Sequence, residues 1–230
     1  MNSLTGQTLA AIVTNNHRAA TVFEKYSLDF CCKGKRSLAE ACAEKNIVQG
    51  DVINDLLNQL SEQPKHIPFA EMTNEQLISY ILIRHHFYVK QSMPTINMHL
   101  QKVAVKHGER FPYMLKVWEL FKHLEQDMLM HLHKEEVILF PRIKELNSEP
   151  ISGNIASIKN PIHVMEAEHD EAGELMYKIR TLTNNYEIPE NACTTFKVVL
   201  GELKEFEEDL HQHVHLENNI LFPNSLALFV

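Results

Sequence analysis

The 230-residue sequence has little glycine and little cysteine, with seven glycines and four cysteines. So few glycines, together with 44% apolar residues, exclude a fibrous or disordered chain and favour a helix-rich globular protein. The cysteines, two of them adjacent at 31 and 32, are not typical of a secreted disulfide framework, so we expect reduced thiols. A formal charge of -8 leaves no basic patch, which argues against a nucleic-acid partner.

Long apolar runs are also missing from the sequence. No run approaches the ~18 residues of a membrane span, and the segment 1–6 lacks the basic and apolar regions of a signal peptide. We therefore expect a cytoplasmic protein without a membrane partner. Histidine, in contrast, is abundant, with fourteen copies.

The chain length allows two domains. Residues 1–60 carry short helical patterns and predict a small helical N-terminal domain. The polar stretch 61–72, which contains two prolines, predicts a linker. Residues 73–230 begin with a capping box at Thr73–Gln76 and predict four helices of roughly 20–35 residues with short connections. The expected fold is all-α, an up-down-up-down four-helix bundle preceded by the small domain.

A repeated motif carries the strongest functional signal. The segments 131–141 and 213–223 are identical at seven of eleven positions, at an offset of 82. Each contains a histidine followed by a glutamate four residues later, and such residues project from the same face of a helix. His131 with Glu135, and His213 with Glu217, therefore predict two pairs of metal-binding side chains on core-facing stripes.

The other two long helices supply one histidine each. Apolar residues at three-and-four spacing favour His86 over the adjacent His85 on the core face of the first helix, although a swap between the two stays open. The same spacing selects His169 in the third helix. Because buried glutamates need compensating charge, four histidines and two glutamates predict a dinuclear centre. Iron is the expected metal, with manganese as the reserve and zinc disfavoured.

From Thr73 onward these motifs resemble the hemerythrin-like bundles, although respiratory hemerythrins have a fifth histidine. A closer resemblance covers nearly the whole chain, to the RIC (repair of iron centres) family of ScdA/YtfE-like di-iron proteins. It rests on the segments Tyr26–Lys35, Met165–Leu175 and Leu216–Pro223. The resemblance implies repair of iron-sulfur clusters damaged by oxidative or nitrosative stress and a ScdA-type N-terminal domain. It also implies iron ligands at the same six positions.

Several polar residues near the motifs are secondary candidates. Asp127 and Asp209 stand one turn before a ligand histidine, where each either orients an imidazole or remains a solvated surface carboxylate. Glu168 is a candidate for lining a path for iron or protons. His133 and His215 are expected to face away from the core, because they lie about 200° around the helix from the glutamates two residues on.

Cys31 and Cys32 allow two interpretations. They are either small buried hydrophobic residues or reactive thiols whose pKa the two neighbouring lysines lower. Their position in a glycine-containing turn favours the second interpretation, with a role in redox chemistry, metal transfer or partner docking. Cys42 and Cys193 are expected to be structural.

Three functions compete at this stage. The first is repair of iron-sulfur clusters by iron delivery or redox support, with damaged iron-sulfur proteins as partners. The second is a di-iron enzyme that reduces nitric oxide or peroxide. The third is a hemerythrin-like module that binds dioxygen for storage or sensing, which the missing fifth histidine disfavours. The sequence leaves open whether the chain forms a homodimer.

Overall fold

The computed structural model describes residues 4–61, 67–148 and 155–229, and every regular element in these ranges is helical. Extended backbone pairs in them only at an isolated bridge between Thr8 and Ser37. The predicted all-α class is therefore confirmed. None of the described helices is both long and apolar enough to cross a membrane.

The chain forms two compact units. The first contains Met1–Ser79 with His211–Val230, and the second contains Tyr80–Leu210. Helix α10 (Thr194–Leu216) contributes to both units, because the division falls after Leu210.

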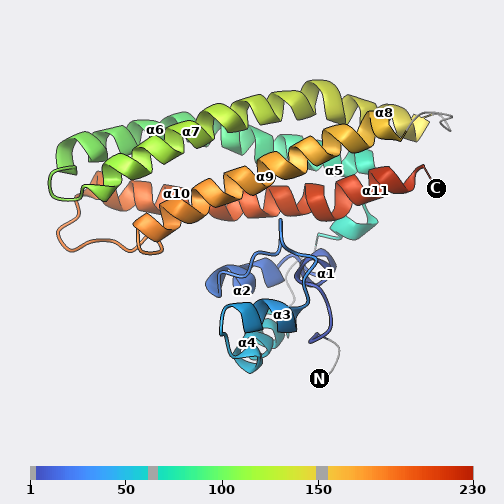
Figure 1. Cartoon of the computed structure of the whole chain (residues 1–230), viewed down its shortest axis with the longest axis horizontal. Coiled ribbons are helices and arrows are strands. Elements are labelled where there is room, and N and C mark those ends of the chain that lie inside the picture. Colours follow the sequence, from blue (N-terminus) through green and yellow to red (C-terminus); the bar gives the residue numbers. More distant parts are fainter. Residues whose placement is uncertain (1–3, 62–66, 149–154, 230) are drawn as a thin grey trace. The chain divides into compact units, whose positions relative to one another are not determined.

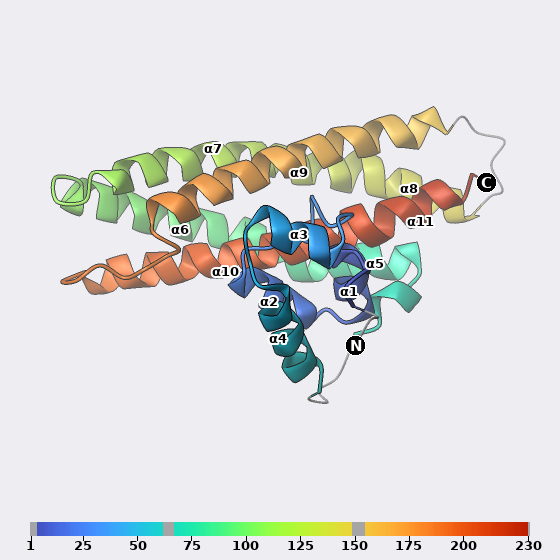
Figure 2. The ribbon, with the colours of Figure 1, turned by 60° about the horizontal axis from the view of Figure 1, so that its bottom comes forward.

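The second unit contains four long helical segments: α6 (Phe87–His107), α7 (Tyr113–Lys134), α9 (Ala156–Leu182) and the part of α10 up to Leu210. They run side by side in Figure 1 and again in Figure 2. Helix α7 packs against both α6 and α9. Phe206 of α10 lies edge-on to Phe121 of α7, with ring centroids 5.7 Å apart. The predicted four-helix bundle is confirmed.

The buried faces of this bundle follow the helical period. Helix α9 buries residues at three-and-four spacing, as the sequence predicts: Ile162, Met165, His169, Ala172, Met176 and Ile179. Helix α7 does the same through Leu124, Met128 and His131. Histidines therefore interrupt two otherwise apolar core stripes.

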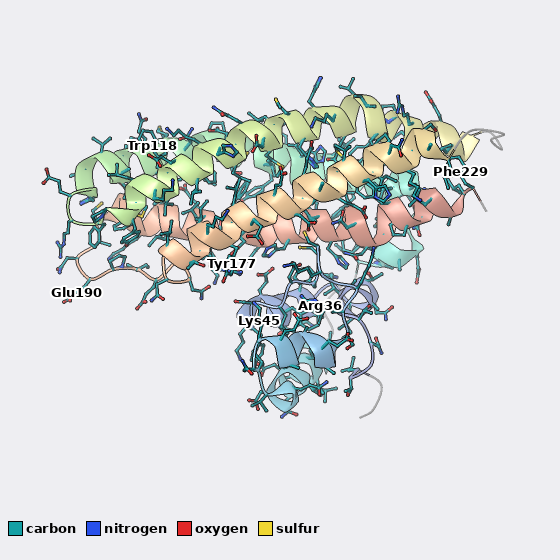
Figure 3. The ribbon with its side chains drawn as sticks, in the orientation of Figure 1. Arg36, Lys45, Trp118, Tyr177, Glu190 and Phe229 are labelled. Atoms are coloured by element: carbon teal, nitrogen blue, oxygen red, sulfur yellow. The ribbon has the colours of Figure 1, made fainter. Side chains whose placement is uncertain are left out.

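Trp118 of α7, labelled in Figure 3, connects two helices of the bundle. Its indole Nε1 donates to Asn97 Oδ1 of α6 at 2.8 Å, and Lys122 Nζ lies 4.4 Å from the centroid of its ring. A half-buried tryptophan whose donor is satisfied stabilises the pairing of α6 with α7.

In the part of the chain that the structure describes, three π-helical turns interrupt the long helices. They are η2 (Leu82–His86) between α5 (Asn74–Ile81) and α6, η3 (Glu135–Leu139) between α7 and α8 (Phe140–Ser148), and η4 (Glu217–Leu221) between α10 and α11 (Phe222–Ala227). Such turns are rare and frequently mark functional sites. The turns η3 and η4 occupy equivalent positions in the sequence repeat, so the repeat extends to the local backbone.

The first unit contains the short helices α1 (Leu9–Asn15), α2 (Ala19–Lys25), α3 (Leu38–Glu44) and α4 (Gln49–Ser61), labelled in Figure 1. Helix α1 begins at Thr8, whose hydroxyl accepts from Ala11 N at 3.1 Å. Helix α3 begins with a capping box formed by Ser37 and Glu40. Fully buried side chains fill the space between them, including Phe23, Phe30, Leu38 and Leu56.

The predicted linker over 61–72 lies partly outside the described residues, and its described end contains the 3-10 turn η1 (Phe69–Glu71). One of the predicted short connections, across residues 147–154, also falls largely outside them. The capping box before α5 is confirmed. Thr73 N donates to Gln76 Oε1 at 2.9 Å, and Gln76 N donates to Thr73 Oγ1 at 3.3 Å.

Candidate metal centre

All six residues predicted as metal ligands are buried. None is more than 2% exposed, and both glutamates are fully buried: His86, His131, Glu135, His169, His213 and Glu217. Burying an ionised carboxylate costs several kcal/mol unless charge compensates it, on the order of the ~3–5 kcal/mol measured for uncompensated buried charges. The burial therefore selects these side chains as candidates for binding a cation.

In the second unit, three of these side chains converge. Nε2 of His131 lies 3.0 Å from Nε2 of His169 and 3.3 Å from Oε2 of Glu135. Each of the three side chains has one potential metal-binding atom, and these three atoms all lie within 4.8 Å of one another. Two ligand atoms at about 2.1 Å from one metal ion, at a right angle, stand about 3.0 Å apart. The spacing of the two imidazoles thus fits one metal ion.

Glu135 also faces a fourth ligand candidate. Its Oε2 lies 3.4 Å from Nε2 of His86, which belongs to a different helix from His131. A single carboxylate therefore contacts imidazoles from both α7 and η2. One oxygen of a fully buried carboxylate therefore lies near imidazoles from two helical segments.

In the first unit, the second half of the repeat forms the equivalent pair. Nε2 of His213 lies 3.1 Å from Oε1 of Glu217, close to the 3.3 Å between His131 and Glu135. Each glutamate is the first residue of a π turn. The two halves of the repeat therefore agree in side-chain spacing as well as in sequence.

The outer nitrogen of each of two histidines is held by a carboxylate. Nδ1 of His131 lies 2.9 Å from Glu168 Oε2, and Nδ1 of His86 lies 2.8 Å from Glu136 Oε1. An ionised carboxylate only accepts, so Nδ1 carries the proton and Nε2 is left to bind a metal. The sequence analysis predicted that Glu168 lines a path for iron or protons. It did not identify Glu136, although Glu136 directly follows the predicted ligand Glu135.

Lysines complete both arrangements. Lys134 Nζ donates to Glu168, and Lys90 Nζ donates to Glu136 at 2.6 Å. Hydrogen bonds from His131 and Lys134 lower the pKa of Glu168 to about 2. Burial acts to raise the pKa of Glu136, but hydrogen bonds from Lys90 and His86 outweigh it and the pKa is lowered. Both carboxylates are therefore ionised at neutral pH, as holding an imidazole proton requires.

A cavity of about 240 Å³ lies between α7 and α9 and reaches His131. Its polar lining includes Asp127, Lys134 and Glu168. A cavity of this size admits several water molecules or a small diatomic molecule. It therefore gives solutes a route to one of the candidate ligands.

Two domain families match the chain. Residues 77–224 match the Hemerythrin HHE cation binding domain, and residues 5–60 match ScdA_N, a Domain of Unknown function (DUF542). Relatives described as iron-sulfur cluster repair protein YtfE, from Escherichia coli O81 (strain ED1a) and Escherichia fergusonii, are each 37% identical over 221 residues. The match covers 96% of this chain and 97% of each relative. The chain belongs to the RIC family. Its hemerythrin domain implies iron binding, and the resemblance stated from the sequence is confirmed.

The two aspartates of this RIC-family chain have different surroundings. Asp209 Oδ1 lies 3.1 Å from Nδ1 of His85, which is not one of the six predicted ligands. Asp127 pairs with the exposed His123 at 3.0 Å, and its side chain is 53% exposed. Because Glu168 already holds Nδ1 of His131, Asp127 has no imidazole proton to accept there.

His85 was expected to point away from the core, and this expectation is wrong. Its side chain is fully buried, like that of the adjacent His86. The physical reason is the π turn η2, which contains both residues and inserts an extra residue into the helical turn. The extra residue changes the direction in which the side chains project, so the period of 3.6 does not predict their faces across this turn.

His215 was also expected at the surface, and this is wrong as well. It is 2% exposed, and burial lowers its pKa to about 4. Its ring packs against Phe30 at 5.6 Å between centroids, and Nε2 lies 3.3 Å from Thr14 Oγ1. The helical period predicts that His215 lies on the opposite face of the helix from the candidate metal ligands. That opposite face is covered by residues of α1 and of the α2–α3 segment in the same unit. His133, its counterpart in the repeat, is exposed as predicted.

Cys31 differs from the expectation of a lowered pKa. Cys31 is buried, and its hydrogen bond with Cys32 together with burial raises its pKa well above the usual value. The neighbouring lysines, Lys33 and Lys35, are exposed to solvent, which weakens their effect. Cys42 is buried and its pKa is raised by burial. Cys193 lies 3.2 Å from Nε2 of His107.

We expect Cys31 to react slowly with iodoacetamide at neutral pH in the folded, metal-free protein. A raised pKa leaves less thiolate at a given pH, and the thiolate is the nucleophile. Quantitative peptide mass spectrometry should show Cys31 modified at least tenfold more slowly than in urea, on the order of one pKa unit or more. Modification of native Cys31 as fast as in urea would contradict the buried, protonated state. The half-buried Cys32 in the same peptide serves as the internal comparison.

Replacing Glu168 by glutamine should weaken iron binding roughly 10–100-fold, because the substitution removes the carboxylate that holds the Nδ1 proton of His131. Competition with a ferrous chelator under anaerobic conditions measures the change. Glu166→Gln is the matched control, since Glu166 pairs with the exposed His163 at 3.1 Å on the same helix. Equal affinities for the two variants would exclude the orienting role.

Proposed function

We propose that this RIC-family protein binds two iron ions and uses them to restore damaged iron-sulfur clusters. The proposed ligands are four imidazoles and two carboxylates: His86, His131, Glu135, His169, His213 and Glu217. The observation that carries the proposal is the fully buried Glu135, whose Oε2 lies 3.3 Å from Nε2 of His131 and 3.4 Å from Nε2 of His86. Manganese is the reserve metal.

Two metal positions account for these contacts better than one. His131 and His169 are spaced for one ion, while His86 approaches Glu135 from another helical segment and belongs to a second. The second position then needs further ligands, and the repeat supplies them. His213 and Glu217 match His131 and Glu135 in sequence, burial and spacing.

The chemistry of the donor set fits iron. Imidazole and carboxylate ligands in a four-helix bundle are typical of carboxylate-bridged iron or manganese pairs. When bound, such a pair supplies redox chemistry and open positions for exogenous ligands. The protein keeps each imidazole in the tautomer that presents Nε2. Glu168 and Glu136 do this by accepting the Nδ1 protons of His131 and His86.

The repair role is supported by two observations. Relatives that align with 96% of this chain carry the description of iron-sulfur cluster repair proteins. The ScdA_N match at residues 5–60 adds a cysteine-containing segment that a simple oxygen-binding bundle does not need. We propose that residues 1–60, the linker 61–72 and the bundle 73–230 act as functional parts, and that damaged iron-sulfur proteins are the partners. Unpaired cysteines among the described residues accord with a reducing compartment, the cytoplasm.

Recovery of a damaged enzyme tests this function. An iron-sulfur hydratase is inactivated with nitric oxide, freed of the gas, and mixed anaerobically with the reduced, iron-loaded protein. We expect activity to return with the wild-type chain and with His133→Ala, an exposed histidine outside the site. Glu135→Leu should give no recovery above buffer. Equal recovery with Glu135→Leu, or none with the wild type, would contradict repair through this centre.

The cavity that reaches His131 favours a second candidate function, reduction of nitric oxide or peroxide. Consumption of either molecule with an added electron donor, in the absence of any damaged protein, would distinguish it from repair. Single-turnover disappearance without sustained turnover would leave repair as the function.

A further inference from the structure

A second cluster of metal-binding groups lies in the first unit, in the turn between α2 and α3. Sγ of Cys31 lies 3.8 Å from Sγ of Cys32 and 3.3 Å from Oδ1 of Asp29. One ligand atom from each of the three residues lies within 4.8 Å of the others. No residue of this cluster belongs to the proposed iron centre.

The sulfur spacing matches a bound metal. Two thiolates at about 2.3 Å from one ion, at the tetrahedral angle, stand about 3.8 Å apart. A disulfide requires about 2.04 Å between the sulfurs, and both cysteines are free. The side chains are therefore held at the separation that a shared ion needs and not at that of a bond.

The turn positions these groups in advance. Oδ1 of Asp29 accepts hydrogen bonds from the backbone nitrogens of Cys31, Cys32 and Lys33 at 3.1, 3.0 and 3.2 Å. Asn219 Nδ2 donates to the carbonyl oxygen of Cys31 at 3.0 Å. A carboxylate has about four acceptor sites on its two oxygens, so these bonds do not exhaust Asp29. Preorganised ligands lower the entropic cost of binding.

Charge also favours a cation in this turn. The three side chains are neutral or negative. The hydrogen bond with Cys32, burial and the nearby charge of Asp29 raise the pKa of Cys31. A bound cation compensates for the charge of a thiolate, and coordination deprotonates thiols outright. The positive charges of Lys33 and Lys35 are exposed to solvent, where they are screened.

We propose that Asp29, Cys31 and Cys32 form a second metal site for a thiophilic divalent cation such as Zn²⁺ or Fe²⁺. Two thiol protons leave to solvent as two metal–sulfur bonds form, and the Asp29 carboxylate supplies the third ligand. Three protein ligands leave one tetrahedral position open to water or to a ligand from another protein. The site is independent of the iron centre, so either can exist without the other.

Cobalt(II) is the probe that separates the two sites. Thiolate ligands give Co²⁺ an intense sulfur-to-metal charge-transfer band in the near ultraviolet, whereas imidazole and carboxylate ligands do not. The reduced, full-length, metal-free chain is titrated anaerobically with Co²⁺ beyond the capacity of both sites. We expect the band in the wild type and in Cys193→Ser, and its loss in Cys32→Ser. Asp29→Asn keeps the oxygen that accepts the backbone bonds but loses the charge, and should raise the dissociation constant roughly tenfold.

A band that is absent from the wild type, or that survives in Cys32→Ser, overturns the proposal. A measurement on the unmodified chain guards against a variant that fails to fold. Saturating Zn²⁺ should slow the alkylation of Cys32 by iodoacetamide at least tenfold and leave Cys193 unaffected. Equal rates for Cys32 with and without Zn²⁺ overturn the proposal on their own.

Discussion

Glu135→Leu should purify without iron and yet be at least as stable as the metal-free wild type. Leucine removes the carboxylate that contacts both His131 and His86, so neither of the two proposed metal positions keeps its proposed shared ligand. In the metal-free protein, the buried carboxylate with its imidazole partners costs desolvation energy, and an apolar replacement is neutral or stabilising by up to about 4 kcal/mol. Iron content by plasma emission and urea unfolding with chelator present measure the two effects.

The combination of these two results separates a metal ligand from a structural residue. Loss of iron together with a clear loss of metal-free stability would mean that Glu135 supports the fold and not the metal. Retention of both irons would exclude it as a ligand. His133→Ala, on the exposed face of the same helix, should change neither quantity.

Gly34→Ala should destabilise the N-terminal segment by about 3 kcal/mol, at the upper end of the range for overpacking. A Cβ at Gly34 would meet the backbone oxygen of Phe30 and would lie 2.9 Å from Cβ of Ala10. Neither neighbour can move away easily, because Ala10 N also donates to Gly34 O at 2.9 Å. Hydrogen exchange of residues 5–60 measures the effect.

Gly50→Ala is the matched control for this prediction. Gly50 lies in α4, and no atom lies within 4 Å of a Cβ built there. Alanine in a helix is favoured over glycine by roughly 1 kcal/mol, so this variant should be neutral or stabilised. Equal protection in the two variants would show that the contact with Phe30 and Ala10 does not constrain the turn.

The bundle and its buried histidines could be predicted because a regular helix has a fixed period. Three-and-four spacing selects the buried face of α9, including His169, without knowledge of any neighbour. The repeat likewise identifies His131 with Glu135, because residues four apart share a face. For these residues, the regular geometry of a helix was sufficient to predict which side chains are buried.

The remaining features depend on departures from that period or on segments distant in sequence. The π turn η2 buries His85, and nothing in the periodicity indicates a π turn. His215 is buried because Phe30 and Thr14, about 200 residues earlier, cover its face of the helix. The raised pKa of Cys31 reflects its hydrogen bond with Cys32 and its burial, with Asp29 close by, and sequence order alone does not indicate this arrangement.

The most direct test of the dinuclear iron centre is to load the reduced, full-length chain anaerobically with ⁵⁷Fe²⁺, remove unbound metal, and combine metal analysis with Mössbauer spectroscopy. The Cys31→Ser, Cys32→Ser double variant is measured in parallel, so that iron held by those thiols is not counted. Two irons per chain, retained in the double variant and magnetically coupled after oxidation, is the predicted result. One uncoupled iron per chain, or iron that disappears with the cysteines, would contradict a centre built from histidines and bridging glutamates.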